Sequence, residues 1–184
     1  MRPQTHVPLS AILLIVGAVL CFTLLDATVK ALADRYPIPL LVWARYAVQL
    51  LVILLWLLPR MGVGLLRTPR FRLQFVRAAI LPLSSLCFFS ALRYLPLAEA
   101  TAINYATPVL VIILAVLFLG ERMTRPRIAL VLAGIAGMFL IVRPGSVVFQ
   151  GAALLALGSA VFYGTFQILT RTLAGEDSRV LLFY

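Results

Sequence analysis

Long uninterrupted apolar segments are the feature that most restricts how this chain can fold. Six runs of mainly Leu, Ile, Val and Ala are long enough for a helix to cross about 30 Å of hydrocarbon, which takes roughly 20 residues. They cover Leu9–Ala33, Pro39–Leu58, Gln74–Tyr94, Leu97–Leu119, Pro126–Arg143 and Phe149–Arg171, and a seventh begins at Arg179. The runs lack the alternation of period two that membrane β-strands require. The pattern therefore predicts an all-α integral membrane protein, a polytopic helical bundle with six full transmembrane helices and the start of a seventh.

The composition agrees with lipid as the solvent and narrows the chemistry. Hydrophobic residues make up 63% of the 184 positions and charged residues 12%, whereas soluble domains average about 45–50% and about 25%. One histidine and two cysteines cannot build a zinc cluster or a disulfide framework. The sequence contains no P-loop, zinc-protease or serine-hydrolase motif, and it offers no nucleophile–base pair. We therefore expect no metal, no cofactor and no enzymatic activity.

The basic residues predict the orientation, because cytoplasmic loops of membrane proteins are enriched in Lys and Arg. With the N-terminus inside, eleven of the 16 basic residues lie at inner helix ends and four lie at outer ends. Topology thus accounts for the formal charge of +10, and we expect no nucleic-acid partner. The first apolar run could instead be a cleaved signal peptide, but it is long, and Asp26 and Lys30 would fall just before the cut. We expect a multi-pass protein with a cytoplasmic N-terminus.

An internal repeat indicates a two-part architecture. A shift of 141 positions aligns Leu9–Asp34 with Gln150–Gly175 without a gap, and six of the 26 aligned pairs are identical. A polar pair, Asp26 with Gln167, is more informative than the apolar identities. Five helices separate the two copies, and an odd number inverts the second copy, as in many secondary carriers with a site at the membrane midplane.

The repeat also predicts domain boundaries. Residues 1–145 are expected to form the first five-helix repeat and residues 146–184 an incomplete start of the second. A complete second copy would extend about 100 residues beyond Tyr184. The fold expected from the repeat is therefore a bundle of five-helix inverted repeats.

The most specific stretch of sequence lies between residues 91 and 144. It contains Ala91-Leu92-Arg93-Tyr94-Leu95-Pro96, Pro108-Val109, Leu119-Gly120-Glu121-Arg122 and Ile141-Val142-Arg143-Pro144. These motifs resemble those of the EamA-type members of the drug/metabolite transporter superfamily, and the resemblance extends from Leu9 to about Leu173. It implies ten helices in two inverted repeats, a location in the bacterial inner membrane, and transport of small metabolites without ATP.

The resemblance and the repeat together favour a secondary transporter that moves small metabolites by alternating access. Amino-acid-like or other polar solutes are the candidate substrates. The alternative is a non-transporting, truncated membrane component or assembly partner, since the sequence ends inside the seventh span. The expected partners are the lipid bilayer, a small-molecule substrate, and either a homo-oligomer or a missing C-terminal half.

Ionisable side chains inside the spans mark a candidate substrate pathway. Such a group costs about 2.5–3.5 kcal/mol on insertion scales and usually faces a cavity or a partner. Asp26 and Arg45 each lie roughly 10 Å below the outer surface at 1.5 Å per residue, so neighbouring helices can bring them together. They form either a structural ion pair or part of a polar layer that holds the substrate, and Lys30 lies one helical turn from Asp26.

Two further spans contribute polar candidates. Thr101, Asn104 and Pro108 share one helix face, where the carbonyl that Pro108 leaves unpaired either bends the helix or binds a polar group. A second stripe of polar side chains, spaced by four, contacts either the substrate or a neighbouring helix. The full set of candidate pathway residues is Asp26, Lys30, Arg45, Thr101, Asn104, Tyr105, Pro108, Ser159, Tyr163 and Gln167.

Overall fold

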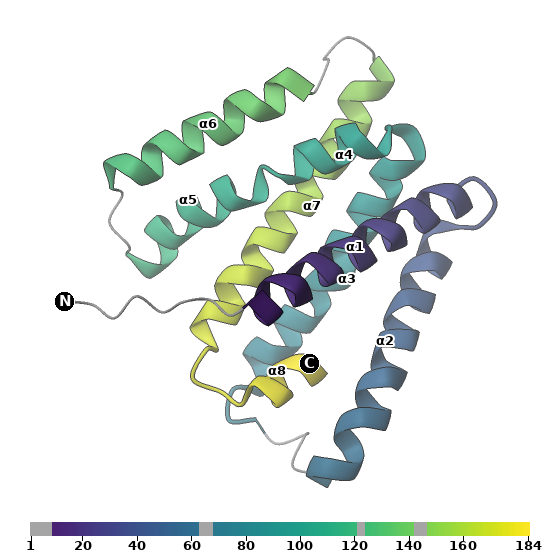
Figure 1. Ribbon diagram of the computed structural model, residues 1–184, viewed down its shortest axis with the longest axis vertical. Coiled ribbons are helices and arrows are strands. Elements are labelled where there is room, and N and C mark those ends of the chain that lie inside the picture. The colour runs from purple at the N-terminus through teal and green to yellow at the C-terminus, as the bar shows by residue number, and fades with distance from the viewer. Residues whose placement is uncertain (1–8, 63–67, 121–123, 142–146) are drawn as a thin grey trace.

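The computed structural model describes residues 9–62, 68–120, 124–141 and 147–184, which fold into eight helices (Figure 1). In chain order they are α1 (Leu9–Leu32), α2 (Ile38–Met61), α3 (Phe71–Tyr94), α4 (Leu97–Asn104), α5 (Thr107–Leu119), α6 (Arg125–Ile141), α7 (Val147–Thr172) and α8 (Ser178–Phe183). These described ranges contain no β-strand, so the predicted all-α class is confirmed. The motif residues Glu121, Arg122, Arg143 and Pro144 lie outside the described residues.

Five helical segments of the described chain are long and apolar enough to cross a bilayer. They are Leu9–Leu32, Ile38–Leu57, Phe71–Tyr94, Leu97–Phe118 and Gly151–Thr172, with lengths of 20 to 24 residues. These segments correspond to five of the six predicted spans. The remaining prediction, Pro126–Arg143, corresponds to α6, a helix of 17 residues that is followed by residues outside the described part.

The fourth predicted span, Leu97–Leu119, consists of two helices that meet beside Pro108, where the sequence predicts a bend or a freed carbonyl that binds a polar group. α4 ends at Asn104 and α5 begins at Thr107. Pro108 has no amide hydrogen to donate to the Asn104 carbonyl one turn earlier. The Thr107 hydroxyl donates to that carbonyl instead, at 2.7 Å between Oγ1 and O. The break is therefore satisfied within the chain, as lipid surroundings require.

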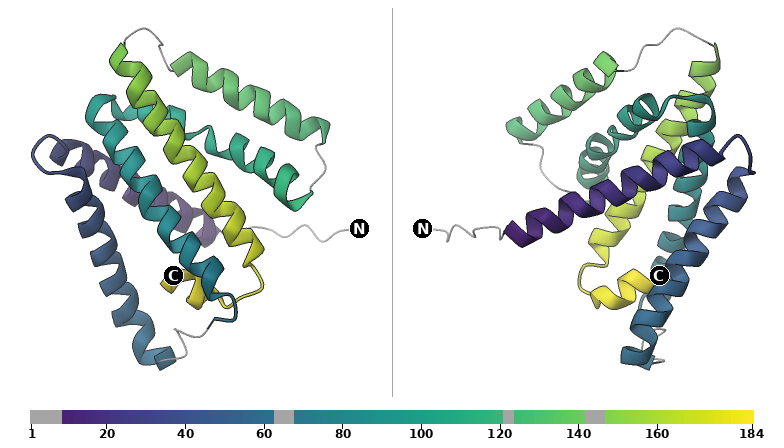
Figure 2. Two further views of the ribbon diagram at one scale, coloured as in Figure 1. Left: turned by 180° about the vertical axis from the view of Figure 1, so that it is seen from behind. Right: turned by 45° about the vertical axis from the view of Figure 1, so that its right-hand side comes forward.

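α3 and α7 lie side by side and form the centre of the bundle (Figure 2). Ala152, Ala156 and Ala160 of α7 recur every four residues and are at most 3% exposed. On the same helix Ser159 bonds to Ser84 of α3, so this face of α7 meets α3. Small residues at such spacing let two helix backbones approach closely, which is a principal way in which helices associate in lipid.

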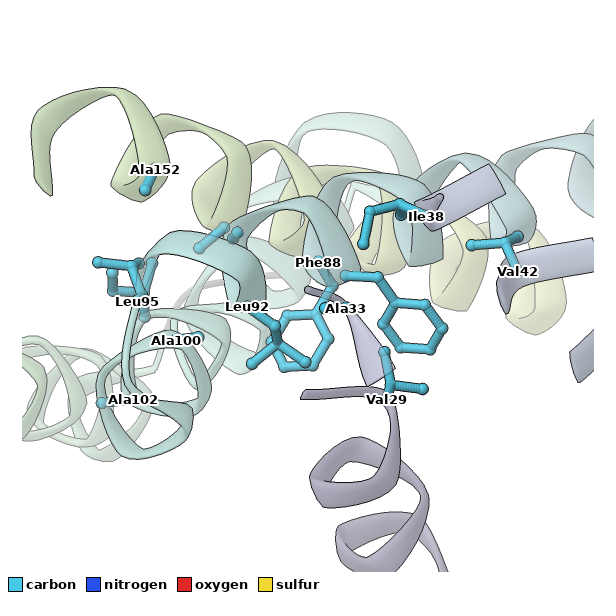
Figure 3. Packing of buried hydrophobic residues seen from close by; sticks show 14 residues of the cluster. Val29, Ala33, Ile38, Val42, Phe88, Leu92, Leu95, Ala100, Ala102 and Ala152 are labelled. Carbon is cyan, nitrogen blue, oxygen red and sulfur yellow. The ribbon is translucent and has the colours of Figure 1, made fainter. Parts of the chain in front are cut away.

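The main apolar core lies where the α1–α2 loop, the end of α3, α4 and the start of α7 meet (Figure 3). Phe89, Leu92 and Ala100 in this core are fully buried. In α1, by contrast, Val29 is the one buried residue. Large apolar side chains are exposed along most of the helix. A helix that is apolar all round and exposed in the isolated chain suits contact with lipid tails.

Lys30 joins α1 to the end of α3. Its ammonium donates hydrogen bonds to the backbone carbonyl of Leu92 and, at 3.0 Å between Nζ and O, to that of Leu95. Carbonyls at the end of a helix lack intrahelical donors, and a cation there also interacts favourably with the helix dipole. Lys30 therefore acts as a C-terminal cap of α3.

We predict that Lys30→Met destabilises the protein, because the carbonyls at the end of α3 lose their charged donor while the apolar stem is kept. Hydrogen bonds to a charged group contribute about 1.5–3 kcal/mol, so the melting temperature of the purified full-length protein in detergent should fall. Lys30→Arg should restore most of the loss. Arg93→Met, at an exposed position of α3, is the control and should have little effect. An unchanged melting temperature in Lys30→Met would contradict the capping role.

The contact between α3 and α7 gives a second prediction. Ala156→Leu should separate the two helices, because a larger side chain has no space at a fully buried position. Overpacking of this kind costs about 1–3 kcal/mol and should lower the melting temperature in detergent. Ala18→Leu adds the same atoms at an exposed position of α1 and should leave the melting temperature unchanged. Equal behaviour of the two variants would mean that α3 and α7 do not pack closely.

Candidate functional site

A cavity of about 400 Å³ lies among α1, α2, α3, α4 and α7. This volume is within the range of small-molecule sites, about 300–1,000 Å³. The lining combines one acid, one base, side-chain amides, hydroxyls and aromatic rings: Phe22, Asp26, Arg45, Gln49, Leu81, Ser84, Ser85, Phe88, Asn104, Ser159, Tyr163 and Phe166. Within the described residues, no group of three or more His, Cys, Asp or Glu side chains could hold a metal ion.

Asp26 of α1 and Arg45 of α2 are the charged side chains of this lining. No ion pair joins them in the part of the chain that the structure describes, although the Arg45 charge acts electrostatically on Asp26. The guanidinium carbon of Arg45 lies 5.5 Å from the ring centroid of Phe89 and 5.7 Å from that of Tyr46. Cation–π contacts hold the guanidinium and leave its charge in place. The cavity wall thus carries an acid and a base that do not neutralise each other directly.

Hydrogen bonds of hydroxyl groups connect α2, α3 and α7 around the cavity. Ser84 Oγ of α3 donates to the Ser159 carbonyl of α7 at 3.0 Å and lies 3.1 Å from Ser159 Oγ. Tyr46 Oη of α2 shares a hydrogen bond of 2.8 Å with Ser85 Oγ of α3. The three serines are buried, and each has a protein partner. Their observed contacts fix the shape of the cavity wall by bonding neighbouring helices.

The structure brings together half of the predicted pathway residues. Those that line the cavity are Asp26, Arg45, Asn104, Ser159 and Tyr163. The other candidates lie outside the lining: Lys30 caps α3, Thr101 and Gln167 are half-buried, Tyr105 is 69% exposed at the break between α4 and α5, and Pro108 lies in the first turn of α5. The cavity therefore draws its predicted members from four different spans.

Sequence reasoning found Asn104 and Tyr163 but missed other aromatic and amide residues of the lining, among them Phe22, Gln49 and Phe166. Their spacing from predicted residues could have identified them, since residues three or four apart share one face of a helix. Phe22 precedes Asp26 by four residues, and Gln49 follows Arg45 by four. Phe166 follows Tyr163 by three, and their rings stack with a centroid distance of 6.0 Å and an interplanar angle of 12°.

Comparison with known proteins identifies relatives that are similar to this chain in sequence. It is 33% identical over 177 residues to the pseudopaline exporter CntI of Pseudomonas aeruginosa, which covers 95% of this chain and 62% of that protein. It is 31% identical over 123 residues to a riboflavin transporter of Brucella anthropi, with 67% and 43% covered. An S-adenosylmethionine uptake transporter of Rickettsia conorii is 25% identical over 124 residues, with 67% and 42% covered. The chain thus spans about three-fifths of the exporter's length and less of the other two.

The fold also has a solved counterpart. A protein crystal structure with 25% sequence identity matches with a TM-score of 0.62, over 86% of this chain and 58% of that one. Residues 9–143, most of the chain, match the EamA-like transporter family. That family and the relatives named above are membrane transporters of small molecules and not enzymes. With its apolar helices and its motifs, this multi-pass membrane protein belongs to the EamA-like transporter family.

Proposed function

We propose that the protein carries a small zwitterionic solute, such as an amino-acid-like metabolite, across the bacterial inner membrane. The observation that carries the proposal is the acid and base on one cavity, Asp26 and Arg45, with no ion pair between them. Charged groups inside a bilayer are costly, so they mark a substrate path or find a partner in the protein. A zwitterion supplies both partners at once, its ammonium to Asp26 and its carboxylate to Arg45.

The rest of the lining supports a solute of this size and polarity. Phe22, Phe88 and Tyr163 offer apolar contact, and Gln49 and Asn104 offer amide donors and acceptors. Small-molecule sites typically combine a mainly apolar wall with a few placed polar groups. The relatives are named for three different solutes, and the charges of the cavity favour a zwitterion among small solutes.

Alternating access is the mechanism that we propose for this family member. Discontinuous helices often surround the midplane site of secondary carriers, and the break between α4 and α5 directly follows Asn104 of the cavity lining. The sequence repeat would pair α1 with α7 in inverted orientation, with residues 1–145 as the first repeat and 146–184 as the start of the second. Rocking of the two repeats about the cavity would expose it to each side in turn, with the N-terminus in the cytoplasm.

The proposal predicts that Asp26→Asn and Arg45→Ala abolish transport but leave membrane insertion intact. The measurement is counterflow of a mixture of radiolabelled amino acids into sealed proteoliposomes that contain the full-length protein. Each variant should lose at least about tenfold in rate, because one charge of the solute is left without its counter-charge inside the membrane.

Matched control variants come from the exposed α1–α2 loop. Asp34→Asn and Arg35→Ala make the same chemical changes outside the cavity and should transport at the parent rate. Normal counterflow by both cavity variants would remove Asp26 and Arg45 from the mechanism. A folded, membrane-inserted parent that moves none of the amino acids would contradict the zwitterionic substrate and favour the non-transporting alternative.

A further inference from the structure

A second cavity, of about 310 Å³, adjoins the first. Gln49, Leu81 and Phe166 line both cavities. On α3 the first cavity reaches from Leu81 toward the end of the helix, and the second reaches back to Arg77, one turn nearer its start. The two spaces therefore meet at these three side chains, one each from α2, α3 and α7, which we call the partition.

Phe166 is held in this partition from both sides. In the first cavity its ring stacks on Tyr163. On the side of the second cavity, the guanidinium carbon of Arg77 lies 4.5 Å from the centroid of the Phe166 ring. A cation over the face of an aromatic ring attracts it electrostatically, and more strongly where water is excluded. The Phe166 ring is thus held by Tyr163 on the side of the first cavity and by the Arg77 guanidinium on the side of the second.

Arg77 is itself held tightly, with 6% of its surface exposed. Its Nε donates to Thr170 Oγ1 at 2.7 Å, which lies one turn beyond Phe166 on α7. One terminal nitrogen donates to the Leu181 carbonyl of α8 at 2.9 Å and to Gln74 Oε1 at 3.4 Å. Gln74, fully buried, donates from Nε2 to Glu176 Oε2 at 2.8 Å. These bonds join the start of α3 to the end of α7 and to α8, which lie together in Figure 1.

We propose that Phe166 is the gate between the two cavities and that Arg77 is the positioning residue that keeps it closed. The inference rests on the proposed transport function and adds the element that would separate the two sides of the pathway. A solute in the first cavity can reach the second only when the Phe166 ring leaves the guanidinium. Hydrophobic constrictions of this kind gate membrane pathways by excluding water and solute.

A cysteine-accessibility experiment tests the gate without any substrate. The full-length protein carries Cys21→Ser and Cys87→Ser, and Asn104→Cys in the first cavity serves as the reporter. A membrane-impermeant maleimide is added to vesicles from the face at which α3 begins, and the labelling rate is measured. The parent should react slowly, and Phe166→Ala should raise the rate on the order of tenfold because the partition loses its ring. Phe166→Tyr should stay close to the parent.

The role of Arg77 has its own readout. Arg77→Met keeps an apolar stem but removes the charge, so labelling from this face should rise several-fold, and Arg77→Lys should return it to the parent rate. Phe118→Ala, at a position of α5 that is 75% exposed, is the matched control and should not change labelling.

Two results would overturn the gate. One is equal labelling of the parent and a membrane-inserted Phe166→Ala, and the other is an unchanged rate in Arg77→Met. Should Phe166→Ala fail to reach the membrane, Phe166→Leu replaces it and must raise labelling for the gate to stand. Either negative result leaves the counterflow experiment untouched, so failure of the gate and failure of the transport function can be told apart.

Discussion

A charged side chain inside a bilayer needs either a protein partner or a water-filled space, because hydrocarbon cannot solvate it. The bundle meets this requirement in two ways. Lys30 and Arg77 donate to carbonyl and hydroxyl oxygens of other helices, and Arg77 also donates to the Gln74 amide oxygen of its own helix. Asp26 and Arg45 instead line a cavity without pairing to each other. The division between charges that hold the structure and charges that line a cavity is the basis of the functional proposal.

The contact between α3 and α7 makes this division possible. Alanines on α7 allow the two backbones to approach, and the bond between Ser84 and Ser159 fixes their register. Because the two helices pack at the centre of the bundle, both contribute to the wall of each cavity. The same contact carries Phe166 to Arg77, so helix packing and the proposed gate depend on one interface.

The sequence predicts the spans well, because long apolar runs in a membrane protein have few alternatives to helix. It also identifies Asp26, Arg45 and Asn104 of the cavity, since polar side chains stand out in apolar segments. Pro108 correctly signals a disturbance in the fourth span. The helix does more than bend there: it ends at Asn104, and the Thr107 hydroxyl satisfies the Asn104 carbonyl that Pro108 leaves unpaired.

Contacts between helices far apart in the chain could not be predicted. The pattern counts Arg77 only as a positive charge at an inner helix end, whereas the structure buries it against Phe166, Thr170 and Leu181. Likewise Lys30 finds its carbonyl partners more than 60 residues away, at the end of α3. Periodicity reports which face of a helix is polar but not which helix that face meets.

If Asp26 and Arg45 together bind one zwitterionic solute, that solute should stabilise the folded protein against heat. The melting temperature of the purified full-length protein would be measured with a panel of amino acids, each beside its matching amine and its matching carboxylic acid. Binding to the native state raises the melting temperature as ligand concentration exceeds the dissociation constant. We predict that one or more amino acids raise the melting temperature, that the singly charged analogues do not, and that Asp26→Asn abolishes the rise. Stabilisation by an amine or an acid alone to the same degree, or by none of the amino acids, would contradict it.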